Sequence, residues 1–144
     1  MKFDYHWYEE GGIAIAVLRH KGNEWTGTAF CHTDDRDFCS QHTGMIIAEH
    51  RATIEYYKHR KKELRIEIDA LDRLMRQITR GADCSPESRE MKVLRSELRR
   101  LKNELATVRC ALSQLRENLK EFIDIKEQLY TQIRAKRKVA EQID

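Results

Sequence analysis

The chain has 144 residues and a mass of 17.1 kDa; 40% of its residues are hydrophobic and 35% are charged, and its mean hydropathy is -0.74. This balance excludes one large globular core, and no apolar run approaches the ~20 residues that span a bilayer, so no membrane partner is expected. Residues 1–44 hold four Lys and Arg against seven Asp and Glu, a net charge of −3, so the rest of the chain carries +6 and the total is +3.

A small β-sheet is predicted for the first module, residues 1–44. Three runs rich in aromatic and β-branched residues, 1–8, 13–19 and 24–31, are separated by turns that contain glycine. Three antiparallel strands are the simplest interpretation of this pattern. A sheet of this size buries too little apolar surface by itself, so we expect a helix on one of its faces.

A first long helix is predicted over residues 45–80. From Met45 the pattern becomes that of a helix: apolar side chains from Ile47 to Ile78 recur at steps of three, four and seven residues, which is the spacing of one helix face. Gly81 suits the position that follows the last helical residue, and we therefore expect the helix to end there.

A turn over residues 81–86 and a second long helix over 87–144 complete the predicted fold. Ser85 followed by Pro86 is typical of a helix start. From Met91 onward, apolar residues keep a spacing of three and four over about six heptads, which predicts a coiled-coil seam. The expected fold class is α+β: a small N-terminal antiparallel β-sheet of about three strands, followed by a long antiparallel coiled-coil helical hairpin.

All four cysteines are expected to be reduced thiols. The first residues carry aromatic and acidic side chains and no secretory signal, which predicts a cytoplasmic location. Cys31, His32, Cys39 and His42 are ligand types that zinc prefers, but the seven residues between the two cysteines do not match the usual ligand spacing. We therefore predict no metal and no cofactor.

Enzymatic activity is the weakest of the functional hypotheses. Cys39 and His42 are the only nearby pair of a nucleophile and a base, and no third group orients them. Phosphate-binding glycine loops and the H-E-x-x-H and G-x-S-x-G motifs are absent from the sequence. The protein is therefore expected not to be an enzyme.

Capture of a phosphorylated small molecule is a more specific hypothesis. Phosphates need arginine donors, a base needs an aromatic face, and a ribose needs hydrogen-bonding groups. The predicted sheet, the segment after it and the start of the first helix combine these side chains. The candidate ligand-binding residues are Arg19, Trp25, Phe30, His32, Arg36, Phe38 and Arg51.

Nucleic-acid binding is an alternative that the basic runs at 58–62 and 136–138 suggest. Acidic residues interleave with these runs at helical spacing, for example Glu63 and Glu67. Most of the charges therefore fit the solvated outer face of a coiled coil. Nucleic acid ranks below a small molecule as the expected partner.

Two segments resemble a pattern found in small phage proteins. Residues 26–38 read TGTAFCHTDDRDF and residues 43–52 read TGMIIAEHRA. They follow the pattern G-x-A-x-C-x-x-x-D-x-x-[FY] and then G-x-x-I-A-x-x-R-A. This pattern resembles the phage anti-Thoeris family, whose members sequester cyclic ADP-ribose signals with an N-terminal sheet and long helices that oligomerise.

The resemblance implies a sponge without catalytic activity. Such a protein binds a cyclic nucleotide made by a bacterial defence system in the host cytoplasm and keeps it from its effector, and the ligand lies where protomers of a homo-oligomer meet. The long hairpin departs from the family pattern. A coiled-coil adaptor or inhibitor that binds a host protein or nucleic acid therefore stays the alternative. The positions that match the motif are Gly27, Ala29, Cys31, Asp35, Phe38, Gly44, Ala48, Arg51 and Ala52.

Overall fold

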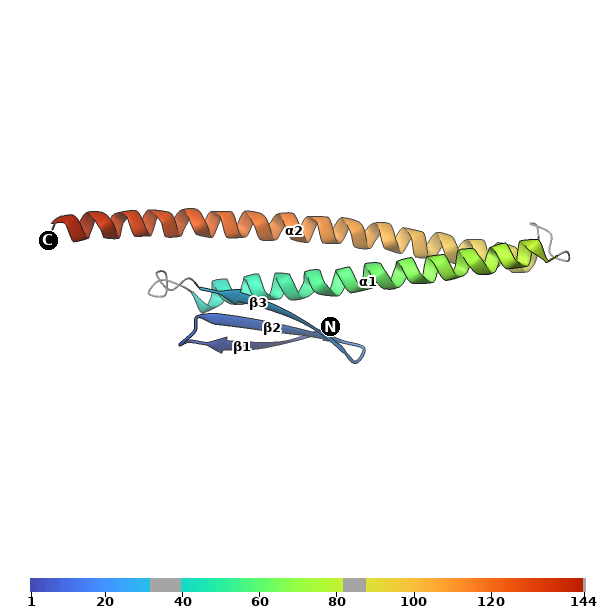
Figure 1. Ribbon diagram of the computed structural model, residues 1–144, viewed down its shortest axis with the longest axis horizontal. Helices are drawn as coiled ribbons and strands as arrows, with labels where there is room; N and C mark the ends of the chain where they lie inside the picture. Colours follow the sequence, from blue (N-terminus) through green and yellow to red (C-terminus); the bar gives the residue numbers. More distant parts are fainter. Residues whose placement is uncertain (32–39, 82–87, 144) are drawn as a thin grey trace. The chain divides into compact units, whose positions relative to one another are not determined.

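The computed structural model describes residues 1–31, 40–81 and 88–143 (Figure 1). A three-stranded antiparallel sheet is followed by two long helices, which confirms the predicted α+β fold. No helix in these ranges combines the length and the hydropathy that crossing a membrane requires. The elements, in chain order, are β1 (Lys2–Tyr8), β2 (Ile13–His20), β3 (Asn23–Phe30), α1 (Gln41–Arg80) and α2 (Arg89–Ile143).

The chain divides into two compact units. The first contains Met1–Tyr56 and Gln114–Asp144, and thus holds the sheet, the first part of α1 and the last part of α2. The second contains Tyr57–Ser113, and thus holds the rest of both helices. Each unit has its own cluster of buried side chains.

In the first unit, β2 is the central strand and pairs antiparallel with β1 and β3. Lys21 and Gly22 form the two-residue turn between β2 and β3, so that His20 pairs with Asn23. Both turn residues have a positive φ, 50° for Lys21 and 78° for Gly22. This conformation is that of a type I′ turn, whose twist matches that of the strands, so the turn fixes the register of this hairpin.

Helix α1 packs against small residues of the sheet. Ala14 and Ala16 of β2 and Ala48 and Ala52 of α1 are all fully buried. Gly27 of β3 is a point of very close approach, because a Cβ atom there would lie 2.0 Å from the Ala48 carbonyl oxygen and 2.4 Å from the Ala52 nitrogen. The absence of a side chain at Gly27 therefore allows the helix backbone to lie directly on the strand.

Aromatic side chains surround this alanine core. The Trp25 ring packs edge-on against Tyr56, with a centroid distance of 5.0 Å. The Tyr5 hydroxyl donates a hydrogen bond to the Glu49 carboxylate at 3.1 Å. Partial burial and this hydrogen bond raise the pKa of Tyr5 above its ordinary value. The aromatic residues that pack against the core are Phe3, Trp7, Trp25 and Tyr56.

Helix α1 begins at Gln41, four residues before the predicted start at Met45. Ser40 caps it: the Thr43 backbone N–H donates to Ser40 Oγ at 3.4 Å, and the Gly44 N–H donates to the Ser40 carbonyl oxygen at 3.0 Å. The first turn is polar, so the apolar periodicity that marks the helix in the sequence starts only after it.

Helix α2 begins at Arg89. Ser88 is its cap, because the Met91 N–H donates to Ser88 Oγ at 3.2 Å and the Lys92 N–H donates to the Ser88 carbonyl oxygen at 3.0 Å. Ser85 and Pro86, which the sequence suggested as the helix start, lie outside the described residues.

The second unit is a pair of antiparallel helices around a leucine-rich core. Leu64 and Ile68 of α1 pack with Leu101, Leu105 and Val108 of α2, and Leu64 is fully buried. The α2 residues of this core belong to the predicted coiled-coil seam. The two helices of this unit are therefore held together by the apolar side chains whose spacing predicted a coiled coil.

An ion-pair network links the two helices on one side of this core. The Arg60 guanidinium donates two hydrogen bonds to Glu104 Oε1, at 2.6 and 3.2 Å. Its Nη1 also lies 3.8 Å from Glu63 and 3.7 Å from Glu67. The hydrogen bond to Glu104 is the largest cause of the raised pKa of Arg60.

Arg60→Ala is expected to lower the free energy of unfolding by about 1 kcal/mol, because three carboxylates lose the cation they share. The loss is no larger because the ion pair between Arg60 and Glu104 is partly exposed to solvent. Denaturant unfolding of the full chain measures this change. Arg76→Ala, an exposed arginine on the same helix, is the control and should change the free energy by less than about 0.5 kcal/mol. Equal values for the two variants would contradict the structural role of Arg60.

Candidate functional site

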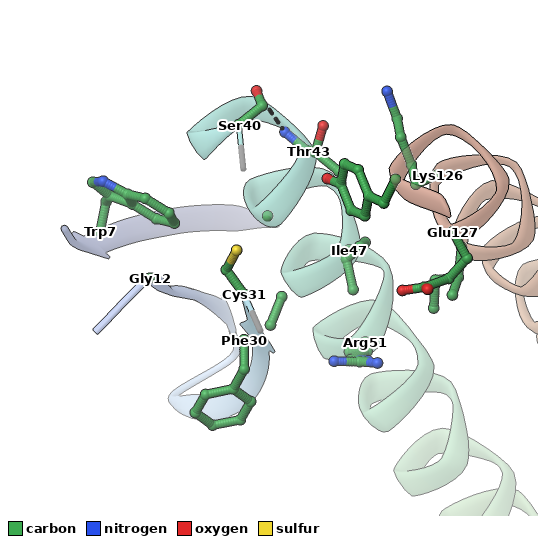
Figure 2. Close-up of a pocket in the computed structure, with 14 residues that line it drawn as sticks. Trp7, Gly12, Phe30, Cys31, Ser40, Thr43, Ile47, Arg51, Lys126 and Glu127 are labelled. Carbon is green, nitrogen blue, oxygen red and sulfur yellow. Dashed lines mark hydrogen bonds between the residues drawn. The ribbon is translucent and has the colours of Figure 1, made fainter. Parts of the chain in front are cut away.

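A cavity of about 200 Å³ lies in the first unit, between the end of β3, the start of α1 and the last part of α2 (Figure 2). Trp7 of β1 and Gly12 of the β1–β2 turn complete its wall. Both polar and apolar groups line it. The charged and aromatic side chains at the cavity are Trp7, Phe30, Arg51, Lys126, Glu127 and Tyr130.

Arg51 is held at the cavity by the strand beside it. Its Nη1 donates a hydrogen bond to the Thr28 carbonyl oxygen of β3 at 2.6 Å. Figure 2 shows the Arg51 guanidinium against α1, with Phe30 and Cys31 on the neighbouring strand. A guanidinium has five N–H donors, so this bond fixes its position and leaves donors for a ligand.

The start of α1 forms the next part of the wall. Thr43 and Gly44 line the cavity, and Thr43 is 7% exposed. A Cβ atom at Gly44 would lie 3.0 Å from Ala14 Cβ and 3.4 Å from the Trp7 ring. The N-terminus of a helix favours negative charge. The wall therefore combines the helix N-terminus with the Arg51 cation.

Helix α2 contributes a cation, an anion and an aromatic ring. Lys126, Glu127 and Tyr130 all line the cavity. The Lys126 ammonium also lies 5.5 Å from the centroid of the Phe122 ring. The candidate set from the sequence includes none of the three. Lys126 was nevertheless visible in the sequence as an interruption of the apolar seam, and a cation at a seam position is a signal for such a site.

The β1–β2 turn approaches the end of β3 closely. The Cys31 N–H donates to the Gly12 carbonyl oxygen at 2.8 Å, and a Cβ atom at Gly12 would lie 2.9 Å from Cys31 Cβ. Gly12 also has a φ of 57°. The tight contact and the left-handed conformation both explain why glycine occupies this position.

Cys31 is disulfide-bonded, which corrects the prediction that it is a reduced thiol. The pairing of two sulfur atoms depends on whether the fold brings them together, and local sequence does not show this. Cys110 is an exposed free cysteine. Cys39 and Cys84 lie outside the described residues.

Phe30 and Arg51 are the two sequence candidates found at the cavity. Phe30 is 70% exposed, so its ring is accessible to a ligand. Three further candidates lie outside the described residues. They are His32, Arg36 and Phe38.

Arg19 and Trp25 are not among the residues that line the cavity. Arg19 Nε lies 3.2 Å from Asp4 and 3.0 Å from Glu24, in an ion-pair cluster across the strands. Trp25 packs against Tyr56. Arginine and aromatic side chains in a sheet can thus pack within the protein instead of binding a ligand, and the residue types alone do not show which of the two they do.

The side chains considered for catalysis or metal binding do not gather at the cavity within the described residues. His42 is exposed on α1 and is not one of the lining residues, whereas Cys39 belongs to a range that is not described. No group of three or more His, Cys, Asp and Glu that could hold a metal ion occurs in residues 1–31, 40–81 and 88–143. The groups present suit the binding of an anion with an aromatic part.

Comparison of the chain with protein-family models, curated proteins and solved structures finds no match. The motif positions within the described residues fall into two groups. Gly27, Ala48 and Ala52 bring α1 onto the sheet, whereas Ala29, Cys31, Gly44 and Arg51 line the cavity. The segment 43–52 therefore provides both the alanines that pack α1 against the sheet and Arg51, which this packing places at the cavity.

Proposed function

We propose that the protein is a phage immune-evasion protein that binds and sequesters a cyclic nucleotide of the cyclic ADP-ribose type without chemical change. The observation that supports this proposal is the position of Arg51 beside accessible aromatic rings in one cavity of the first unit. The ligand class is suggested by the motif resemblance, and the residues around the cavity match its chemistry.

The phosphates would be bound by positive groups on two helices. Arg51 and the N-terminus of α1 lie on one wall, and Lys126 lies on another. Hydrogen bonds from a charged donor to phosphate are stronger than neutral ones, and arginine provides two parallel donors. Glu127 has an acceptor carboxylate, which suits the hydroxyl groups of a ribose.

The base would contact the aromatic side chains. A cavity of about 200 Å³ is smaller than the ~300–1,000 Å³ of pockets that enclose a drug-sized ligand. A cyclic nucleotide with two phosphates and two riboses would therefore extend beyond the cavity, where the exposed Phe30 ring offers a face for stacking. Such stacking contributes ~1–3 kcal/mol per base.

A homo-oligomer would cover the part of the ligand outside the cavity. Helix α2 has large apolar side chains that are exposed, among them Ile125 at 62% and Ile143 at 79%. Exposed apolar residues at helical spacing favour packing against another helix. The same observation favours the alternative function, an adaptor that binds a host protein through α2.

Calorimetric titration of the full chain with cyclic ADP-ribose tests the proposal. We expect saturable binding, with a dissociation constant that rises by about tenfold or less between ~50 and ~200 mM salt, because only a few phosphate contacts form. Chromatography of the ligand after the titration should return it unaltered. An absence of heat at every salt concentration, or a converted ligand, would contradict the proposal.

A further inference from the structure

The two units carry opposite net charge. Within 57–113 there are 15 Lys and Arg and 9 Asp and Glu, so the second unit has a net charge of 15 − 9 = +6. The first unit holds the remaining 12 basic and 15 acidic residues, a net charge of 12 − 15 = −3. The excess of basic residues therefore belongs to the helical pair and not to the unit with the cavity.

Glutamates of the second unit gather on one side of its core. Arg60 contacts Glu63, Glu67 and Glu104 there. Arg100 is paired with Glu97 and lies 3.6 Å from Glu104 on the same side. The hydrogen bond from Arg100 lowers the pKa of Glu97. The cations on this side are therefore balanced by carboxylates.

The other side of α2 has a different pattern. Positions 95, 99, 102, 106, 109 and 113 alternate in steps of four and three, so they share one face of the helix. All six are exposed, and they carry Arg, Arg, Lys, Ala, Arg and Ser. No acidic residue occurs at these positions.

Helix α1 adds cations on this same side, where Lys62 and Arg65 are followed by Asp69 and Asp72 at steps of four and three. Leu64 and Ile68 form the part of α1 that points into the core, and Arg60 and Arg65 lie on opposite sides of it. Leu101 and Leu105 do the same on α2, where Glu104 and Lys102 lie on opposite sides. Because Arg60 and Glu104 meet on one side, Arg65 and Lys102 lie on the other. We call this surface the basic face; it includes the exposed side chains of Lys62, Arg65, Arg99, Lys102 and Arg109.

We propose that the basic face binds the phosphate backbone of double-stranded DNA without sequence preference. Arg99 and Arg109 are separated by about 15 Å along α2 at ~1.5 Å per residue. Duplex DNA carries one phosphate charge per ~1.7 Å of its axis, so several phosphates come within reach of these side chains. This surface is in the second unit and does not involve the cavity residues.

The side chains of the basic face favour a duplex over other acidic partners. Single-stranded nucleic acid is bound largely by stacking on aromatic rings, and stable protein interfaces use aromatic or large apolar anchors. The basic face positions on α2 supply neither, since Ala106 and Ser113 are their only uncharged members. The property of these positions that can bind a partner is their positive charge, which complements the regular row of phosphates along a duplex.

Fluorescence anisotropy of a labelled random-sequence DNA duplex, titrated with the full chain at several salt concentrations, tests the proposal. We expect a dissociation constant of ~10⁻⁴–10⁻⁶ M near physiological salt, and a slope of log K against log salt of about −3 to −4 for three or four phosphate contacts. The double variant Arg99→Gln/Lys102→Gln should reduce the magnitude of that slope by about 2 and weaken binding at least tenfold at low salt.

Arg89→Gln/Arg100→Gln removes the same charge from the opposite side of α2 and is the matched control. It should retain the wild-type slope. Equal losses in the two double variants, tighter binding of a single strand of the same sequence, or tighter binding of poly-glutamate than of the duplex would each overturn the proposal. Cyclic nucleotide capture by the Arg99→Gln/Lys102→Gln variant should equal that of the wild type, which keeps this proposal separate from the first.

Discussion

Gly27→Ala is expected to lower the free energy of unfolding by about 3 kcal/mol, which is the upper part of the range for overpacked cores. The new Cβ atom would lie 2.0 Å from the Ala48 carbonyl oxygen and 2.4 Å from the Ala52 nitrogen. Both are backbone atoms, so no side-chain rotation relieves the clash. The helix has to move away from β3, which opens the alanine core and breaks packing along the whole interface.

Denaturant unfolding followed by circular dichroism measures the effect of Gly27→Ala. Gly81→Ala is the matched control, because a Cβ atom there meets its nearest neighbour, the Ile78 carbonyl oxygen, at an ordinary 3.5 Å. It should change the free energy by less than about 0.5 kcal/mol. A Gly27→Ala variant as stable as the wild type would show that α1 does not pack on the sheet as described.

Arg51→Ala is expected to weaken cyclic nucleotide binding by about 10- to 100-fold, because a hydrogen bond to a charged group contributes ~1.5–3 kcal/mol. The side chain is exposed and its one described partner is the Thr28 carbonyl oxygen. Its removal should therefore leave the fold intact. Arg51→Lys should restore only part of the affinity, since a lysine lacks the paired donors that match a phosphate.

Arg19→Ala tests whether the cavity, and not simply the presence of arginines in the sheet, determines ligand binding. Arg19 was a sequence candidate, but it pairs with Asp4 and Glu24 and does not line the cavity. Calorimetric titration should give this variant the wild-type affinity. If Arg19→Ala lost binding while Arg51→Ala kept it, the cavity would not be the ligand site.

Much of the fold could be predicted because its signals are local. Glycine-containing turns separate the three strands, and the leucine spacing of 91–112 is that of the core it forms. The start of α1 was harder to predict, because Ser40 caps a polar first turn that has no apolar periodicity. Capping depends on one backbone hydrogen bond, which a pattern over many residues does not resolve.

The site could be predicted only in part, because it joins segments far apart in the chain. Arg51 and Phe30 were predicted because phosphates need arginine donors and a base needs an aromatic face. Lys126 and Tyr130 come from α2, and only the return of that helix to the first unit brings them to the cavity. The disulfide of Cys31 was not predicted, because a sequence pattern does not show which sulfur atoms the fold brings together.

Recovery of the bound ligand tests whether the protein captures a cyclic nucleotide without changing it. The purified protein is incubated with a bacterial extract that contains cyclic nucleotide defence signals, washed and heat-denatured, and the supernatant is analysed by mass spectrometry. We expect release of an intact cyclic nucleotide from the wild type and a much smaller amount from Arg51→Ala. An altered nucleotide would indicate an enzyme, and the absence of any nucleotide would favour an adaptor; either result would contradict the proposed function.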